Sequence, residues 1–253
     1  MNLHHRFDGR EAAPVVVLSN SLGSSLAMWE RQVPALTERF RVLRYDQRGH
    51  GASPVPPGPY TIDDFGNDVV DLLDSLGLER VSFCGLSLGG AVGMWLGIHA
   101  PERLERAALC CTAARFGSPE IWAERAAAVR AAGSVEPLAD AVLERWFTTE
   151  FRAEQPDAVA RVRELLVATP AEGYAASCDA LRDCDLRGEL GRISVPTLVV
   201  AGAKDPATPP EQAEEIAAAI PGSRLAIIPD AAHFAQIEQP EAFNRAVVEH
   251  LTG

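Results

Sequence analysis

Short, almost uninterrupted apolar segments alternate along the chain with longer segments whose apolar residues recur at helical spacing. Segments of the first kind are typical of strands buried in a parallel sheet, and those of the second kind are typical of helices packed on its faces. The predicted strands are residues 3–7, 14–20, 41–46, 81–85, 106–112, 197–202 and 224–230. The pattern therefore predicts an α/β protein with a mostly parallel sheet flanked by helices, opened by the first two strands as an antiparallel hairpin.

This alternation of strands and helices stops between residues 116 and 189. The region contains four helical patterns separated by prolines, which favour helix ends. The four patterns span residues 118–133, 136–151, 156–169 and 170–185. We therefore expect residues 1–115 and 190–253 to form the α/β core, and residues 116–189 to form a helical lid inserted into it.

Residues 81–97, VSFCGLSLGGAVGMWLG, combine a buried strand, a serine between two glycines and a helix rich in small residues. This is the layout of a nucleophile elbow, a sharp strand-to-helix turn that presents a serine at its tip. Gly85 and Gly89 would leave room for the strand and the helix to pass closely around Ser87. The first N–H groups of the helix would face an oxyanion formed during acyl transfer. Ser87 is therefore the predicted nucleophile.

A serine hydroxyl at its ordinary pKa needs a general base, and the chain offers six histidines. His233 follows the last predicted strand and so reaches the carboxyl edge of the sheet, where Ser87 also emerges. His50 is the alternative, but glycines flank it in a loop where its ring could instead bind the backbone. We predict that His233 is the base.

The base in turn needs a carboxylate to orient its ring. Asp205 comes just beyond the predicted strand next to the one that leads to His233. The chain order Ser87, Asp205, His233 is that of hydrolases with a nucleophile elbow. Asp230 is the alternative acid, although it lies three residues before His233 in the same short loop and could cap a turn. Asp205 is the predicted orienting acid.

Stabilisation of an oxyanion requires two hydrogen-bond donors. One would be the backbone N–H of Leu88, the residue after the nucleophile, and the other would come from the loop after the first parallel strand. In that loop, SNSLGSS, Asn20 and Ser21 occupy the positions of the usual His and Gly, so the backbone N–H of Leu22 is the predicted second donor. The other interpretation of SNSLGSS is a simple polar turn.

Charge and cysteine content limit the partners and the compartment. A net charge of −12 and a pI near 5.0 argue against nucleic acid or an anionic membrane as a partner, and an anionic substrate would need local cations. The first residues lack the apolar core of a signal peptide, and no apolar run is long enough to span a membrane. Five cysteines without CxxC spacing are expected to be buried free thiols, which favours the cytoplasm. The sequence does not specify an oligomeric state.

With these segments in view, the chain resembles the α/β-hydrolase fold family over nearly its whole length. The landmark loops that match in order are SNSLGSS, YDQRGHGAS, CGLSLGG, AGAKDPATPP and PDAAHFAQIEQPEAF. Within this family the chain is most similar to the 3-oxoadipate enol-lactonases, because of SNSLG in place of HG-x-P, YDQRGHGAS, GLSLGG and a WFTTEF-like lid segment. Family members that hydrolyse epoxides or carbon–halogen bonds carry an aspartate nucleophile, so Ser87 excludes those activities.

The resemblance implies hydrolysis of a small-molecule enol-lactone with an acetate arm to 3-oxoadipate, in the β-ketoadipate pathway of bacterial aromatic catabolism. Ser87 would attack the lactone carbonyl, His233 would take its proton, and the N–H groups of Leu22 and Leu88 would bind the oxyanion. No metal or organic cofactor is implied.

The substrate carboxylate and ring would have to be bound by the lid. Trp146 is the predicted substrate-binding residue, and Trp122, Phe147 and Tyr174 are further aromatic candidates. The other interpretation of each is ordinary packing between lid and core. The sequence does not distinguish among the lid arginines, which are Arg125, Arg130, Arg145, Arg161, Arg163, Arg182 and Arg187.

Two other functions are compatible with the same residues. One is another serine hydrolase of this fold, either a carbon–carbon bond hydrolase of ring-fission products or a small esterase with perhydrolase activity. The other is a sensor that binds a small signal and turns it over slowly. Many turnovers per second would identify an enzyme rather than a sensor.

Overall fold

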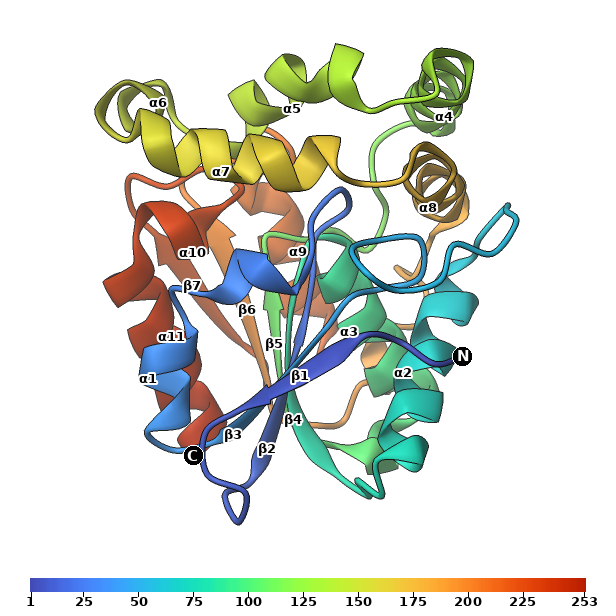
Figure 1. The fold of residues 1–253 in the computed structure, drawn as a ribbon. Coiled ribbons are helices and arrows are strands. Elements are labelled where there is room, and N and C mark those ends of the chain that lie inside the picture. The colour runs from blue at the N-terminus through green and yellow to red at the C-terminus, as the bar shows by residue number, and fades with distance from the viewer.

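The computed structural model describes all 253 residues, which form a seven-stranded sheet with helices on both faces and a layer of helices above one edge (Figure 1). The strands are β1 (His5–Asp8), β2 (Val15–Ser19), β3 (Arg41–Tyr45), β4 (Val81–Leu86), β5 (Leu104–Cys110), β6 (Thr197–Gly202) and β7 (Arg224–Ile228). Their order in the sheet is β1-β3-β2-β4-β5-β6-β7, and every pair except β1–β3 is parallel. The predicted architecture is confirmed.

The expected opening hairpin is wrong. β1 pairs antiparallel with β3, from His5 opposite Tyr45 to Asp8 opposite Val42, and β3 separates β1 from β2. Four of the five residues of β2 are buried, whereas none of the four residues of β1 is. β2 therefore lies inside the sheet, covered on both faces, and the partly exposed β1 takes the edge.

The helices of the core pack on the two faces of the sheet. α1 (Val33–Thr37) packs with α11 (Pro240–Thr252), and α2 (Ile62–Ser75) packs with α3 (Leu88–His99). The remaining core elements are α9 (Pro210–Ala219), α10 (Ala235–Glu238), η1 (Leu26–Trp29), η2 (Pro101–Arg103) and η4 (Leu190–Arg192). None of the helices is both long and apolar enough to cross a membrane.

Five helices lie between β5 and β6 in the sequence and form the layer at the top of Figure 1. They are α4 (Pro119–Ala132), α5 (Ala139–Trp146), α6 (Thr149–Glu154), α7 (Pro156–Val167) and α8 (Ala171–Asp183), with the short η3 (Glu136–Leu138) before α5. The single helical pattern expected over residues 136–151 is therefore divided. Phe147 has extended backbone angles, and Thr148 caps α6 by accepting a hydrogen bond from the N–H of Phe151 at 3.2 Å.

α3 is the central helix of the molecule, because every residue from Leu88 to Ile98 is buried. It contacts β2, β4 and β5, the strands in the middle of the sheet. The small residues of its sequence make this possible, since a helix surrounded by protein on all sides needs an apolar and compact surface. The residue at its first turn is thereby fixed over the centre of the sheet.

Candidate active site

Ser87 lies at the tip of the turn between β4 and α3, in a strained backbone conformation. Its φ of 58° and ψ of −114° place a non-glycine residue in a region that L-amino acids rarely adopt. Hydrogen bonds hold it there: its N–H donates to the carbonyl of Cys110 at 2.9 Å, and its carbonyl accepts the Thr112 hydroxyl at 2.7 Å. The sharp strand-to-helix turn predicted from the sequence is therefore present in the structure, with Ser87 at its tip.

The two glycines around Ser87 are required by backbone contacts. A Cβ atom on Gly85 would lie 2.0 Å from the carbonyl oxygen of Gly89, and a Cβ on Gly89 would lie 2.2 Å from that of Ser19. Both obstacles are backbone atoms, which cannot rotate out of the way as a flexible side chain could. Only glycine, which has no side chain, therefore fits at positions 85 and 89 of this turn.

His233 and Asp205 meet at the carboxyl edge of the sheet, as predicted. The Nδ1–H of His233 donates to Oδ2 of Asp205 at 2.8 Å, and both side chains are buried. Asp205 accepts three more hydrogen bonds, from the N–H groups of Ala207 at 2.7 Å and Thr208 at 3.0 Å and from the Thr208 hydroxyl at 2.7 Å. The acid is thus fully hydrogen-bonded, and its contact fixes which nitrogen of His233 faces the cavity.

The carboxyl pKa of Asp205 is determined by two opposing effects. Burial raises it, but the charge and hydrogen bond of His233, together with the donors of Thr208, outweigh burial and bring the pKa below its ordinary value. Because the folded-state pKa is below the unfolded one, ionised Asp205 stabilises the fold at neutral pH. That stabilisation is lost as the pH falls below about 4 and through the folded-state pKa.

The alternative acid and base lie elsewhere. The side chain of Asp230 is 74% exposed and pairs with Lys204 at 3.1 Å rather than with His233. The ring of His50 is buried in backbone contacts: Nδ1 donates to the carbonyl of Arg48, and Nε2 accepts the N–H of Gly23, both at 3.0 Å. His50 therefore shapes the loop that carries Leu22 and does not reach Ser87 as a base.

The two predicted oxyanion donors share an unusual feature: the N–H groups of Leu22 and Leu88 donate no hydrogen bond within the protein. Their neighbours are all engaged. The N–H of Ser21 contacts the sulfur of Met28 at 3.3 Å, that of Gly23 donates to His50, and that of Gly89 donates to Asn20 at 3.0 Å. SNSLGSS is therefore more than a polar turn, because it leaves one donor free beside Ser87.

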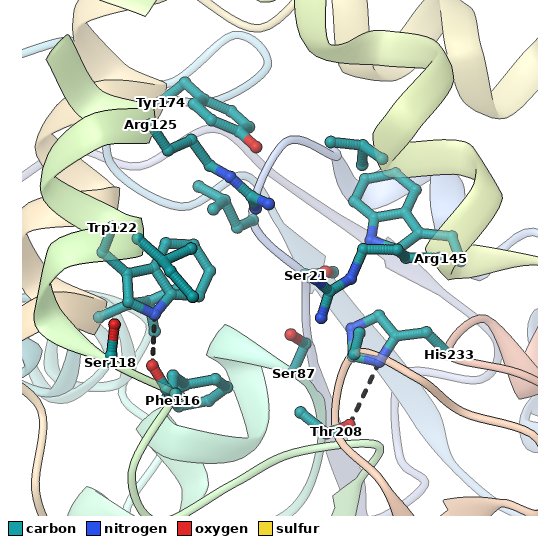
Figure 2. Close-up of a pocket in the computed structure, with 17 residues that line it drawn as sticks. Ser21, Ser87, Phe116, Ser118, Trp122, Arg125, Arg145, Tyr174, Thr208 and His233 are labelled. Carbon is teal, nitrogen blue, oxygen red and sulfur yellow. Dashed lines mark hydrogen bonds between the residues drawn. The ribbon is translucent and has the colours of Figure 1, made fainter. Parts of the chain in front are cut away.

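Ser87 and His233 line a cavity between the sheet and the helices α4, α5 and α8. Figure 2 shows their side chains facing this space from below, with Arg125 of α4 and Arg145 of α5 on opposite sides above them. No hydrogen bond joins the Ser87 hydroxyl to His233, a contact that in serine hydrolases commonly tightens only when substrate binds. The arrangement is compatible with a serine nucleophile and its base beneath two cationic side chains.

Arg125 and Arg145 are the lid arginines that line this cavity. Neither forms an ion pair. The guanidinium of Arg125 lies 4.9 Å from the Trp122 ring centre, and Arg145 donates to the carbonyl of Pro206 at 3.1 Å. Arg161 is exposed on α7, and the others are paired with carboxylates on the lid surface, namely Arg130, Arg163, Arg182 and Arg187. The cavity is therefore positive within an acidic protein.

Trp146 also lines the cavity and is held by the segment after His233. Its ring stacks on Phe234 with a centroid separation of 4.3 Å and an interplanar angle of 18°, and its carbonyl accepts the N–H of Phe234 at 2.9 Å. Trp122 and Tyr174 line the cavity as well, whereas Phe147 packs behind them against Phe234. The structure thus places Trp146, the predicted binding residue, at the wall above the base.

Two residues near the site were missed from the sequence. Thr208 contacts both Asp205 and Nδ1 of His233, the latter at 3.3 Å. Its position three residues after Asp205 is the sequence feature that could have indicated this contact. Glu238 is buried, and burial raises its pKa although Ala232 and Thr148 donate hydrogen bonds to it. No group of three or more His, Cys, Asp or Glu side chains is arranged to hold a metal ion.

Comparison with known proteins identifies a family and named relatives with similar sequences. Residues 14–240 match the family described as alpha/beta hydrolase fold. The 3-oxoadipate enol-lactonase 2 of Acinetobacter baylyi is 42% identical over 245 residues, which cover 97% of this chain and 91% of that protein.

Two solved structures are similar to this chain over nearly its whole length. The enol-lactonase from Burkholderia xenovorans LB400 is 49% identical with a TM-score of 0.97, covering 99% of this chain and 96% of that one. A thermophilic esterase from Thermogutta terrifontis is 32% identical with a TM-score of 0.92, covering 99% of this chain and 93% of that one.

We predict that Gly85→Ala lowers the free energy of unfolding by about 3 kcal/mol, because the new methyl group would press on the backbone of Gly89. Gly188→Ala is the matched control, since nothing lies within 4 Å of a Cβ there, and it should change stability by less than about 0.5 kcal/mol. Urea unfolding followed by circular dichroism measures both. Equal effects of the two substitutions would contradict the close approach of β4 and α3.

We predict that Asp205→Asn lowers kcat for an activated ester by roughly a thousandfold, because the amide cannot hold His233 in its present tautomer and orientation. Asp230→Asn removes an exposed carboxylate that does not contact His233, so its kcat should stay within about twofold of the unmodified protein. Steady-state rates of the two variants decide between the acids. A large loss in Asp230→Asn with an active Asp205→Asn would reverse the assignment.

Proposed function

The chain belongs to the alpha/beta hydrolase fold family, and we propose that it is a 3-oxoadipate enol-lactonase that uses Ser87, His233 and Asp205. The observation that carries the substrate proposal is the pair of arginines without ion-pair partners above the serine site. A carboxylate-bearing substrate explains why an acidic protein leaves two guanidinium groups facing a cavity.

In the proposed acylation, the Ser87 oxygen attacks the lactone carbonyl while His233 takes the hydroxyl proton. The carbonyl oxygen becomes an oxyanion and binds the free N–H groups of Leu22 and Leu88. Asp205 stabilises the imidazolium ring that forms. Because these donors are already in position and lack protein partners, they favour the charged intermediate without a prior rearrangement.

Collapse of the intermediate breaks the ring carbon–oxygen bond and expels an enolate, which takes the proton from the His233 imidazolium and tautomerises to the ketone, leaving His233 neutral. The acyl group remains on Ser87. A water molecule, deprotonated by His233, then attacks the acyl carbonyl and releases a carboxylate together with free Ser87. These steps consume only the lactone and water, and they need no metal or organic cofactor.

The acetate arm of the lactone would lie toward the lid. Arg125 and Arg145 would bind its carboxylate, and Trp146 would cover the ring from the wall above His233. We further propose that residues 116–189 act as the lid of an α/β core made by residues 1–115 and 190–253, and that the reaction takes place in the cytoplasm. An esterase acting on neutral esters is the second candidate, because of the likeness to the Thermogutta esterase.

The function is tested by the loss of enol-lactone absorbance with purified protein, corrected for spontaneous hydrolysis. We expect fast, saturable turnover, and Ser87→Ala should reduce it to near background because no other nucleophile faces the cavity at the elbow. Turnover of p-nitrophenyl acetate without any turnover of the lactone would replace the proposal with the esterase.

Removing the positive charge of the cavity should affect anionic substrates selectively. We expect Arg125→Gln and Arg145→Gln each to lower kcat/KM for the enol-lactone by about 10- to 100-fold, the usual effect of losing a hydrogen bond to a charged group. Rates on neutral p-nitrophenyl acetate should stay within about threefold. Arg161→Gln, an exposed arginine of α7, is the control and should change neither rate. Equal losses on both substrates would refute carboxylate recognition by these residues.

A further inference from the structure

Glu238 ends the short helix α10 and is buried beneath the lid. Both of its carboxylate oxygens accept hydrogen bonds. Oε1 accepts the N–H of Thr148 at 2.8 Å and its hydroxyl at 2.7 Å, and Oε2 accepts the N–H of Ala232. Two backbone donors that lie far apart in the sequence therefore share one side chain.

These two donors belong to the two parts of the molecule that enclose the cavity. Thr148 caps α6 and follows the segment that carries Arg145 and Trp146. Ala232 immediately precedes His233 in the loop after β7. Glu238 thus binds the lid on one side and the loop of the base on the other.

A second set of contacts joins the same two segments. The N–H of Phe234 donates to the carbonyl of Trp146 at 2.9 Å, and the two rings stack 4.3 Å apart. We refer to Trp146, Thr148, Ala232, Phe234 and Glu238 as the lid clasp. Because its contacts surround His233 on both sides in the sequence, the position of the base depends on the attachment of the lid.

The chemistry of the clasp favours a carboxylate at position 238. Two backbone N–H groups need two acceptor oxygens, and a carboxylate supplies them without a competing donor. A glutamine has the same shape, but its amide nitrogen would face either Thr148 or Ala232, donor against donor. One buried N–H would then lose its partner and its segment would move.

We propose that Glu238 is a positioning residue for catalysis: by holding the backbone of Ala232 and Thr148 together, it sets both the orientation of His233 and the closed position of the lid. It does not touch the reacting atoms. Its effect on proton transfer should appear with any ester, whereas its effect on the lid should appear only with substrates that the lid binds. The inference rests on the serine chemistry proposed above but not on the identity of the lactone.

The test is Glu238→Gln, assayed on both p-nitrophenyl acetate and the enol-lactone. We expect kcat to fall at least tenfold on both substrates and KM to rise for the enol-lactone alone. Glu241→Gln is the matched control, an exposed glutamate at the start of α11 without a hydrogen-bond partner, and it should change neither constant.

A second pair of variants keeps Glu238 itself intact. Thr148→Val retains the shape of the side chain but removes the hydroxyl, which both donates to Oε1 and caps α6, and Thr148→Ser keeps both contacts. The serine variant should retain several times more activity than the valine variant. Equal kcat values in these two variants would argue that the hydroxyl contact does not contribute to positioning.

A readout independent of turnover separates positioning from simple stabilisation. The Nδ1 proton between His233 and Asp205 should give a low-field proton resonance, and Glu238→Gln should shift or broaden it. A lower thermal midpoint with unchanged kcat and an unchanged resonance would overturn the inference and leave Glu238 a stabilising residue. If neither substrate is turned over, the proposed function fails, and the resonance still decides the role of Glu238.

Discussion

The contact on which the site depends is the approach of two backbone segments at the turn between β4 and α3. Gly85 and Gly89 touch neighbouring carbonyl oxygens where a side chain would have no room. This proximity fixes the strained backbone of Ser87 and brings the loop of Leu22 alongside, through the hydrogen bond from the N–H of Gly89 to Asn20. The proposed nucleophile and the proposed oxyanion donors are therefore products of one packing constraint, and the surrounding burial of α3 keeps it in place.

The charge of the cavity is opposite in sign to that of the protein as a whole. The protein carries a net charge of −12, and most lid arginines are neutralised by nearby carboxylates on the lid surface. Arg125 and Arg145 face the cavity without such partners. A local cationic site can dominate at short range because interactions with distant exposed charges are screened by salt, whereas those in a confined cavity are screened less.

Much of the fold and of the site could be predicted from the sequence, because their signals are local. The GLSLG turn, the strand that precedes His233 and the loop of Asp205 each identify their residue through a few neighbouring positions. The edge position of β1 could not be obtained in this way, since strand pairing joins segments that lie far apart in the sequence. Glu238 was missed for the same reason, as its partner Thr148 lies on another helix and nothing near Glu238 indicates it.

The insertion of the lid between β5 and β6 has a consequence for how the protein is made. The ribosome completes Ser87 and the oxyanion loop first, then the lid, and only afterwards Asp205 and His233. β6 must also return to pair with β5 across the entire lid, a contact between distant parts of the chain that slows folding. On the proposed assignment, a nascent chain holds its nucleophile before it has a base, so hydrolytic activity requires that β7 and the loop of His233 after it have emerged and joined the sheet.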